Sequence, residues 1–536
     1  MQPRAAFGGK AVGYRSPSPF KELLFAGAAL VGLASLVAAP HLQHGGFYSD
    51  DWLNASFYWS HGYREMAVHF WRDLIPWRPV LAFLLPLPHA LFGLDATYHL
   101  LAAFVLGALA SLSFFVFLRA FGVEFHHALA LSLLSLVFPW SGALRLWATA
   151  SMNNVALIAY FLGSVTALRA LSLHRGDRHR RATLHVIAAG FYLVSVLTYE
   201  VAAAAIVFSG LLYRTQLPWR TLRRRWLVDA ALVLVPVAAL AVPTSHARRL
   251  ASLRERAADV PEFVSQGASV FASSFLPRDI SSPLVKLLVL AAVGVIVAAA
   301  LWTARRPDEG EVRKWLVRAA GGIFAVGLGY LMFLGYGLYP LSEGIDDRVN
   351  AFSAFGFVVA IYSVLALLGV LVARGSGPWA AGILAAGTLL VGLGFVQRTR
   401  DEIGRYDAAT AQQNDELARL RALLPRPPHG STIFTFGYPT VSAPGVPIFS
   451  HPWDLSAAVR LRWNDPSLRA IPVEGRSVSC GRSEVSVRVS DNAYTARYDH
   501  AEFVDLSTMR ARHIASRREC LESLTLFESR GMDGGG

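Results

Sequence analysis

Long apolar runs separated by short polar segments fill the chain up to residue 396. A helix needs about 20 consecutive, mainly apolar residues to cross a bilayer. Runs near or above this length occur at residues 20–40, 98–118, 126–140, 152–170, 226–244, 283–303, 315–338, 349–373 and 379–396. A further run, at residues 183–213, is too long for one untilted crossing. The pattern predicts a polytopic α-helical membrane protein.

Basic residues indicate which ends of the spans face the cytoplasm. Arginine is concentrated in residues 169–181, 214–225 and 305–318. The positive-inside rule assigns all three segments, together with the basic N-terminus, to the cytoplasmic side. The first two segments flank residues 183–213, so that run must cross an even number of times. We expect a hairpin of two short helices with Glu200 at its outer tip, which gives about 11 spans in all.

The same reasoning predicts which polar segments share the outer side. These are residues 42–97, 141–151, 246–282 and 339–348. Residues 79–92 are also apolar, but Pro86 and Pro88 lie in their middle and would kink a helix there. We therefore interpret residues 79–92 as a re-entrant or interfacial piece, since a further span would reverse the side of every later basic segment.

The composition changes after residue 396. Residues 398–424 read as a charged amphipathic helix, and strand-like runs follow at residues 431–437, 477–490 and 501–507. We expect a membrane domain at residues 1–396, with its first outer loop at residues 41–97. Residues 397–536 are expected to form a soluble, extracytoplasmic α+β domain.

Composition and charge support this interpretation. Apolar residues make up 54% of the 536 residues and charged residues 16%, which is typical of a membrane protein. The net charge of +13 would suit a nucleic-acid-binding protein, but the excess basic residues lie in short loops, so topology explains them better. The two cysteines, Cys480 and Cys520, lie in the polar C-terminal region. They could form one disulfide if that region faces an oxidising compartment.

Candidate chemistry is concentrated just after the first apolar run. Asp50 and Asp51 are followed by Trp52 and a dense aromatic stretch. A serine and two aspartates before a helix are also typical of a helix N-terminus, where they cap backbone N–H groups. The capping and functional readings are about equal for the pair on its own. Aromatic side chains suit both sugar rings and the bilayer interface, so they do not decide between the readings.

Charged residues in other predicted outer segments are further candidates. Arg78 suits a phosphate contact, although anchoring to lipid headgroups is the commoner use. Glu200 interrupts an apolar run and is either functional or simply solvated at the hairpin tip. Arg348 could bind a phosphate, or it could pair with the neighbouring Asp346 and Asp347. In the C-terminal region, residues 451–466 would suit glycan contact, but an ordered surface loop is the more frequent role for such a segment.

Four short motifs follow one another in a characteristic order: YSDDW at residues 48–52, Arg78-Pro79, Tyr199-Glu200, and Arg348 in a late outer loop. In this order and placement, residues 20–396 resemble the GT-C glycosyltransferases. These are polytopic membrane enzymes that take sugars from polyprenyl-phosphate donors, and their first outer loop carries an acidic pair and interfacial helices. The sequence has neither a P-loop nor a strand–GxGxxG–helix unit, and such enzymes need no nucleotide site.

The resemblance implies a role for each matching residue. One aspartate of the pair, Asp50 rather than Asp51, is expected to be the base that deprotonates the acceptor hydroxyl, and the reaction inverts the anomeric carbon. Contacts to the donor phosphate or substrate are expected from Trp52, Arg78, Glu200 and Arg348. No cofactor is certain, and a divalent cation shared by the aspartate pair and a nearby histidine stays an open alternative.

The expected partners are a polyprenyl-phosphate sugar donor, a glycan or lipid acceptor of the cell envelope, and membrane lipids, with no nucleic acid. The expected location is the inner cell membrane, with a cytoplasmic N-terminus. The competing class is a non-catalytic transporter or flippase of lipid-linked sugars. Transporters tend to place ionisable groups near the bilayer midplane between repeated halves, whereas this chain has its acidic pair in a surface loop. A scaffold that only binds glycans would leave Asp50, Asp51 and Glu200 unexplained.

Overall fold

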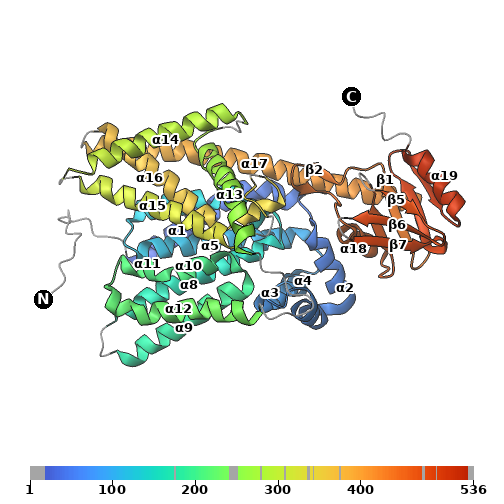
Figure 1. Ribbon diagram of the computed structural model, residues 1–536, viewed down its shortest axis with the longest axis horizontal. Helices are drawn as coiled ribbons and strands as arrows, with labels where there is room; N and C mark the ends of the chain where they lie inside the picture. Colours follow the sequence, from blue (N-terminus) through green and yellow to red (C-terminus); the bar gives the residue numbers. More distant parts are fainter. Residues whose placement is uncertain are drawn as a thin grey trace.

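The computed structural model describes residues 18–528 except 174–176, 241–251, 278–280, 307–308, 335–337, 342, 374–375, 474–476 and 490–491. The basic N-terminal residues before Ser18, which support a cytoplasmic N-terminus, lie outside this part, as do the last residues of the predicted span at 226–244. The described chain forms a bundle of long helices with a smaller α+β domain at one end (Figure 1).

Every apolar run predicted to span the membrane contains a helix. The principal helices are α1 (Pro19–His44), α5 (Ala96–Ala120), α6 (Phe125–Leu136), α8 (Asn153–Ser172), α9 (Arg178–Thr198), α12 (Trp219–Leu240), α13 (Leu253–Ser273), α14 (Pro283–Thr303), α15 (Gly310–Leu331), α16 (Ser353–Ala373) and α17 (Gly377–Leu423). In the described part, 7 helices are long and apolar enough to cross a membrane. The polytopic helical fold class is confirmed, while the count of 11 spans stays a prediction.

The predicted hairpin at residues 183–213 bends where expected. Helix α9 ends at Thr198, and Tyr199 is extended. The chain then returns through a short 3-10 turn, η4 (Glu200–Ala202), and two short helices, α10 (Ala203–Val207) and α11 (Ser209–Arg214). The apolar piece at residues 79–92 is also broken, into α3 (Pro79–Leu84) and α4 (Pro86–Phe92), as its prolines require.

Helix α2 (Asp50–His69) lies in the predicted first outer loop, and a π-helical turn, η1 (Phe70–Leu74), follows it. Gly62 lies inside α2 with a φ of 76°, a conformation that a side chain disfavours, so the helix kinks there. The sequence pattern predicts one amphipathic helix through residues 66–74. Met66, Ala67 and Phe70 are indeed buried, but the exposed Trp71 and Leu74 lie on the π-helical turn.

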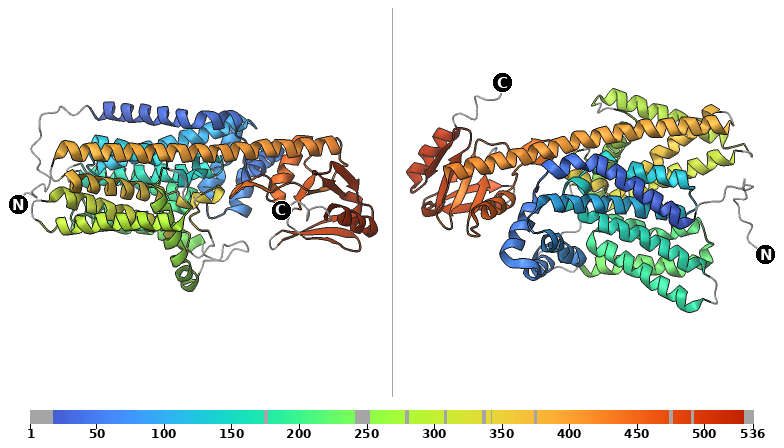
Figure 2. Two further views of the ribbon diagram at one scale, coloured as in Figure 1. Left: turned by 90° about the horizontal axis from the view of Figure 1, so that it is seen from above. Right: turned by 180° about the vertical axis from the view of Figure 1, so that it is seen from behind.

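Helix α17 crosses the predicted division between the two domains. The expected span at 379–396 and the expected amphipathic helix at 398–424 are one continuous helix of 47 residues. Figure 2 shows it running along the bundle and into the C-terminal domain. Leu417 and Leu420, near its end, are packed in one core with Ile433 and Leu455 of that domain. The division placed at residue 396 therefore falls inside a rigid element that both parts share.

The C-terminal domain contains a four-stranded sheet in the order β4-β1-β8-β9. Strand β1 (Thr432–Phe436) pairs in parallel with β4 (Arg469–Pro472) and β8 (Ala501–Asp505), and β9 (Arg510–His513) is antiparallel to β8. Helix α18 (Pro452–Trp463) connects β1 to β4 and packs on β4. A short hairpin, β2 (Val441–Ala443) with β3 (Val446–Pro447), precedes α18.

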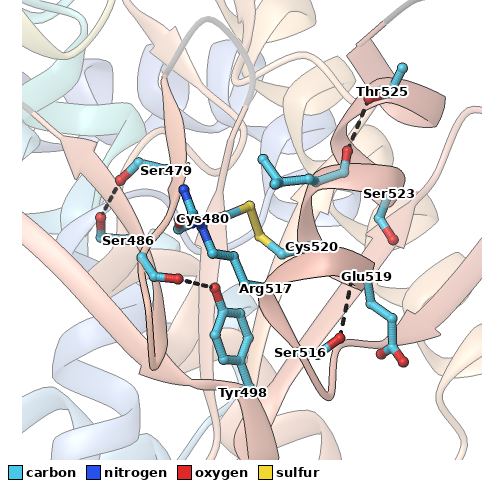
Figure 3. The surroundings of a disulfide bond; sticks show 12 residues. Ser479, Cys480, Ser486, Tyr498, Ser516, Arg517, Glu519, Cys520, Ser523 and Thr525 are labelled. Carbon is cyan, nitrogen blue, oxygen red and sulfur yellow. Dashed lines mark hydrogen bonds between the residues drawn. A yellow bond between two sulfur atoms is a disulfide. The ribbon is translucent and has the colours of Figure 1, made fainter.

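A second sheet in this domain has three antiparallel strands, β5 (Val478–Cys480), β6 (Glu484–Val489) and β7 (Asn492–Arg497). Cys480 on β5 is bonded to Cys520 on α19 (Arg517–Glu528), and Figure 3 shows the bond lying between the sheet and the helix. The disulfide that the sequence left open is present. Strands predicted at 431–437, 477–490 and 501–507 correspond to β1, to the β5–β6 hairpin and to β8.

Segments predicted to share the outer side meet at the end of the bundle that carries the C-terminal domain. Asp51 accepts a hydrogen bond from Thr149, and Gly142 donates one to Asp347. Two more pairs bridge the predicted outer segments: Tyr339 with Asp259, and Arg78 with Glu200. The contacts bring these segments together at one end of the bundle, while the side of the membrane that they face stays a prediction.

Candidate active site

The two adjacent aspartates at the start of α2 have different environments. Asp51 is buried, with an exposed fraction of 2%. Its Oδ1 accepts hydrogen bonds from the backbone N–H and the hydroxyl of Thr149, at 2.8 and 2.5 Å. Its Oδ2 accepts the backbone N–H of Tyr48 at 3.2 Å. Asp51 therefore ties the start of α2 to the segment between α7 (Ala143–Leu146) and α8, in line with the structural reading of the pair.

Asp50 has no comparable set of backbone donors. Its side chain is partly exposed, and it is influenced by the charge of Arg348 and by the polar side chain of Trp453 in the C-terminal domain. Burial raises the pKa of Asp50 above its usual range, while Arg348 and Trp453 oppose this shift. Ser49, the expected cap, makes no capping hydrogen bond with its side chain. Asp50 is thus the aspartate of the pair that faces a cation and solvent.

Arg348 lies on a 3-10 turn, η5 (Ile345–Asn350), and approaches Asp50 from a distant part of the sequence. Its guanidinium lies 5.2 Å from the centre of the Trp147 ring. Among the described residues, its ion pair is with Asp346, at 3.6 Å and with both side chains partly exposed. This separation is longer than that of a charge-assisted hydrogen bond, so the guanidinium keeps donors for another anion.

Asp347 fixes the position of this turn. It is fully buried, and its two carboxylate oxygens accept the backbone N–H groups of Gly142 and Ala143 at 2.6 and 3.0 Å. Of the two aspartates that the sequence offered as partners for Arg348, Asp346 is a weak ionic partner and Asp347 is an anchor for the backbone.

Arg78 and Glu200, predicted separately to contact substrate, are bonded to each other. Arg78 donates from Nε and Nη2 to the two oxygens of Glu200, at 2.8 and 2.7 Å. The guanidinium also lies 3.5 Å from the centre of the Tyr199 ring. The pair joins the first outer loop to the tip of the α9 hairpin, with 11% and 26% of the two side chains exposed. Glu200 is therefore paired rather than simply solvated, and a substrate contact by either residue stays a prediction.

Trp52 connects α2 to the C-terminal domain. Its indole N–H donates to Gln413 on α17 at 3.4 Å. Its ring lies 5.9 Å from that of Phe449, which precedes α18, and 5.5 Å from that of Phe47. Gln413 in turn donates to the carbonyl of Ile448 at 2.6 Å. The structure thus shows a packing role for Trp52, while its predicted substrate contact stays untested.

The one group of three potential metal ligands in the described part of the chain is Glu124, His126 and His127. These residues lie at the start of α6, and the group does not include either aspartate of α2. Glu124 is already paired with Lys314 at 3.0 Å. The geometry gives no support to a cation held by Asp50 and Asp51.

Two neighbours of the aspartate pair were missed from the sequence. Thr149 lies in the predicted outer segment at 141–151, but nothing in its local pattern points to Asp51. Trp453 lies in residues 451–466, which were expected to be a surface loop more often than a binding element. That expectation is wrong, because Pro452–Trp463 form α18, whose buried face includes Leu455, Ala458 and Val459. The proline, the acidic first turn and the apolar residues at helical spacing were the available signal.

No protein-family model matches the sequence, and no curated protein matches it. Among solved structures, ArnT from Cupriavidus metallidurans bound to undecaprenyl phosphate is similar at 12% identity and a TM-score of 0.38, over 84% of this chain and 86% of ArnT. The Archaeoglobus fulgidus oligosaccharyltransferase tethered with an acceptor peptide is similar at 13% identity and a TM-score of 0.41, over 85% of this chain and 63% of the other. Both have the GT-C fold that the sequence motifs resemble. The function of this chain has to be inferred from its own site residues.

Proposed function

We propose that this protein is an inverting membrane glycosyltransferase that moves a sugar from a polyprenyl-phosphate donor to an envelope glycan or lipid. The observation that carries the proposal is that the Asp50 carboxylate lies within the electrostatic influence of Arg348, whose own ion pair with Asp346 is loose, beside a helical bundle. A base and a phosphate-binding cation are the two groups that such a displacement requires.

Asp50 is the general base in this proposal. It takes the proton of the acceptor hydroxyl as that oxygen attacks the anomeric carbon of the donor. The bond from the anomeric carbon to the phosphate oxygen breaks, and polyprenyl phosphate leaves on the opposite face. The proton ends on Asp50, the new glycosidic bond replaces the phosphoester bond, and the configuration at the anomeric carbon inverts.

The environment of Asp50 suits this role. Burial raises its pKa, which makes the carboxylate a stronger base than one in water. The positive charge of Arg348 opposes the shift and favours the ionised form that can accept a proton. Asp51, by contrast, already accepts three hydrogen bonds, so it is the poorer candidate for proton transfer.

Arg348 is the proposed ligand of the departing phosphate. Its guanidinium is 25% exposed and only loosely paired, and its planar donors match phosphate oxygens. Arg78 is less suited to this role because Glu200 already compensates its charge through two hydrogen bonds. We assign the Arg78–Glu200 pair to the wall of the donor site, where it holds the first outer loop against the α9 hairpin.

The proposed location is the outer face of the inner membrane, with the C-terminal domain outside the cytoplasm. The Cys480–Cys520 disulfide supports this side, because structural disulfides persist in oxidising compartments and are rare in the cytosol. A periplasm-active reporter fused after the disulfide domain should be active. If that reporter were silent, and a reporter that works only in the cytoplasm were active at the same position, the proposed topology would be reversed.

The deciding experiment uses a strain that lacks the protein. We expect one sugar component of its envelope glycans to be missing and the matching polyprenyl-phosphate sugar to accumulate. Wild-type protein should reverse both changes, and Asp50→Asn at equal membrane abundance should reverse neither. A transporter predicts a different result. Asp50→Asn would restore the glycan, and in the strain that lacks the protein the lipid-linked sugar would accumulate on the cytoplasmic face of the membrane.

A further inference from the structure

We propose that the C-terminal domain completes the active site and that Trp453 is the positioning residue which orients Asp50. This inference rests on the proposed function, in which Asp50 is the base. It concerns a residue that lies over 400 positions from Asp50 in the sequence and belongs to a different domain.

The first observation is that α18 packs directly on α2. Trp453 lies in the first turn of α18 and Asp50 in the first turn of α2, so the two helix starts face each other. The Trp453 side chain interacts with the Asp50 carboxylate and favours its charged form. An indole has a single N–H donor and no acceptor. It can therefore only donate to a carboxylate, and it favours the ionised form of that carboxylate.

The second observation is that the Trp453 ring is held on its own side. The His451 ring stacks on it, with centroids 3.9 Å apart and planes 9° apart. The buried Asp454 fixes the helix start, because its carboxylate accepts the backbone N–H groups of Ser450, His451 and Leu455. A tryptophan restrained in this way can hold a partner in place instead of following it.

The third observation is that the same domain also holds the segment that carries Arg348. The backbone N–H of Ile345 donates to the carbonyl of Gly445, in the turn between β2 and β3, at 2.9 Å. Glu343 is bonded to Arg405 of α17. The domain thus packs on the helix that begins with Asp50, through α18, and is bonded through the β2–β3 turn to the segment that carries Arg348. Its docking sets the geometry between the base and the phosphate-binding cation.

The matched experiment replaces one indole at a time on α18. Trp453→Phe keeps an aromatic ring against His451 but removes the N–H at Asp50. The control is Trp463→Phe on the same helix, whose indole N–H donates to the carbonyl of Leu424 at 3.0 Å, away from Asp50. Both variants remove one indole N–H from α18, so a difference between them reports on the environment of Asp50.

The first readout is the pH profile of sugar transfer in membrane vesicles. The charged groups around Asp50 are Arg348, which lowers its pKa, and the carboxyls of Asp51 and Asp454, which interact with it unfavourably. Burial is the main cause that raises the pKa of Asp50, and without the Trp453 N–H it is less opposed, so the pKa rises further. We expect the acid limb of the Trp453→Phe profile to move up by about one pH unit, with activity recovered at alkaline pH. The Trp463→Phe profile should keep the wild-type limb.

The second readout does not depend on activity. A carboxyl whose pKa is raised by folding stabilises the protein most below its unfolded pKa, and that contribution is lost as the pH rises through the folded pKa. In detergent, Trp453→Phe should move this decline in apparent Tm to higher pH, and Asp50→Asn should remove it. Profiles of Trp453→Phe and Trp463→Phe that coincide in both readouts would overturn the inference. A shifted Tm profile in a protein without transferase activity would overturn the proposed function and leave the Trp453–Asp50 link standing.

Discussion

Asparagine replacements at Asp50 and Asp51 should separate catalysis from stability between two adjacent residues. Asparagine has nearly the same shape as aspartate but carries no charge and adds two N–H donors. The consequence depends on what each carboxylate accepts. Asp50 faces Arg348 and solvent, whereas Asp51 faces the donors of Thr149 and Tyr48.

At Asp51, the replacement introduces a clash of donors. If the amide oxygen keeps both bonds from Thr149, the new NH₂ group meets the backbone N–H of Tyr48, which lies 3.2 Å from Oδ2. One buried donor is then unsatisfied, at a cost of about 1–3 kcal/mol, and the remaining bonds lose their charge assistance, each worth about 1 kcal/mol. We expect Asp51→Asn to lose about 3–5 kcal/mol of stability, with activity falling only in proportion to folded protein.

At Asp50, the balance is reversed. The charged form is disfavoured by burial, so a neutral amide should leave the apparent Tm at or above that of the wild type. Loss of the general base should lower transfer by about 10²–10⁴-fold. The assays are thermal unfolding in detergent and sugar transfer in vesicles, with both variants matched for membrane abundance. Loss of folded protein in Asp50→Asn, with a stable and inactive Asp51→Asn, would exchange the two roles and refute this reasoning.

Three further outcomes follow from the same contacts. Sugar transfer should fall as the pH drops through an apparent pKa above the ordinary carboxyl value of about 4. Burial raises the pKa of Asp50, and only its ionised form accepts a proton. A pH–rate profile measures this fall. Arg78→Gln and Glu200→Gln should each lower stability by about 3 kcal/mol, since each strands the other charge in a partly buried site, and the double variant should lose less than the sum in a thermal-unfolding cycle. Removing the Cys480–Cys520 bond, which spans 40 residues, should cost about 4 kcal/mol, and limited proteolysis should then cut the C-terminal domain before the helical bundle.

The helical bundle was largely predictable because its signal is local. Each span is a run of apolar residues that must satisfy its own backbone hydrogen bonds in lipid, so the helices can be found one at a time. The bend before Glu200 followed from the two arginine-rich segments that flank residues 183–213. Hydropathy did not show that the helix continues past residue 396, because the later turns of α17 are buried by the C-terminal domain instead of by lipid. The domain division itself stays a prediction.

The site residues were predictable as a set, but their pairings were not. Charge in a predicted outer segment singled out Asp50, Arg78, Glu200 and Arg348, since a buried or interfacial charge is expensive. Which charges meet depends on tertiary structure. Arg78 and Glu200 are 122 positions apart, and no sequence pattern links them. Because Glu200 already compensates the charge of Arg78, we propose Arg348 as the better phosphate ligand, while a substrate contact by Arg78 stays a prediction.

The difference between Asp50 and Asp51 shows how a helix start can separate two adjacent carboxylates. Successive residues of a helix point about 100° apart, so only one of the two can face the bundle. Asp51 faces it and is held by Thr149, and in doing so it orients the first turn of α2. Asp50 consequently points toward Arg348 and α18. The structural and the functional interpretation of the pair are therefore complementary. The anchoring of Asp51 fixes the direction of Asp50, and α18 of the C-terminal domain packs on α2 at the side that Asp50 faces.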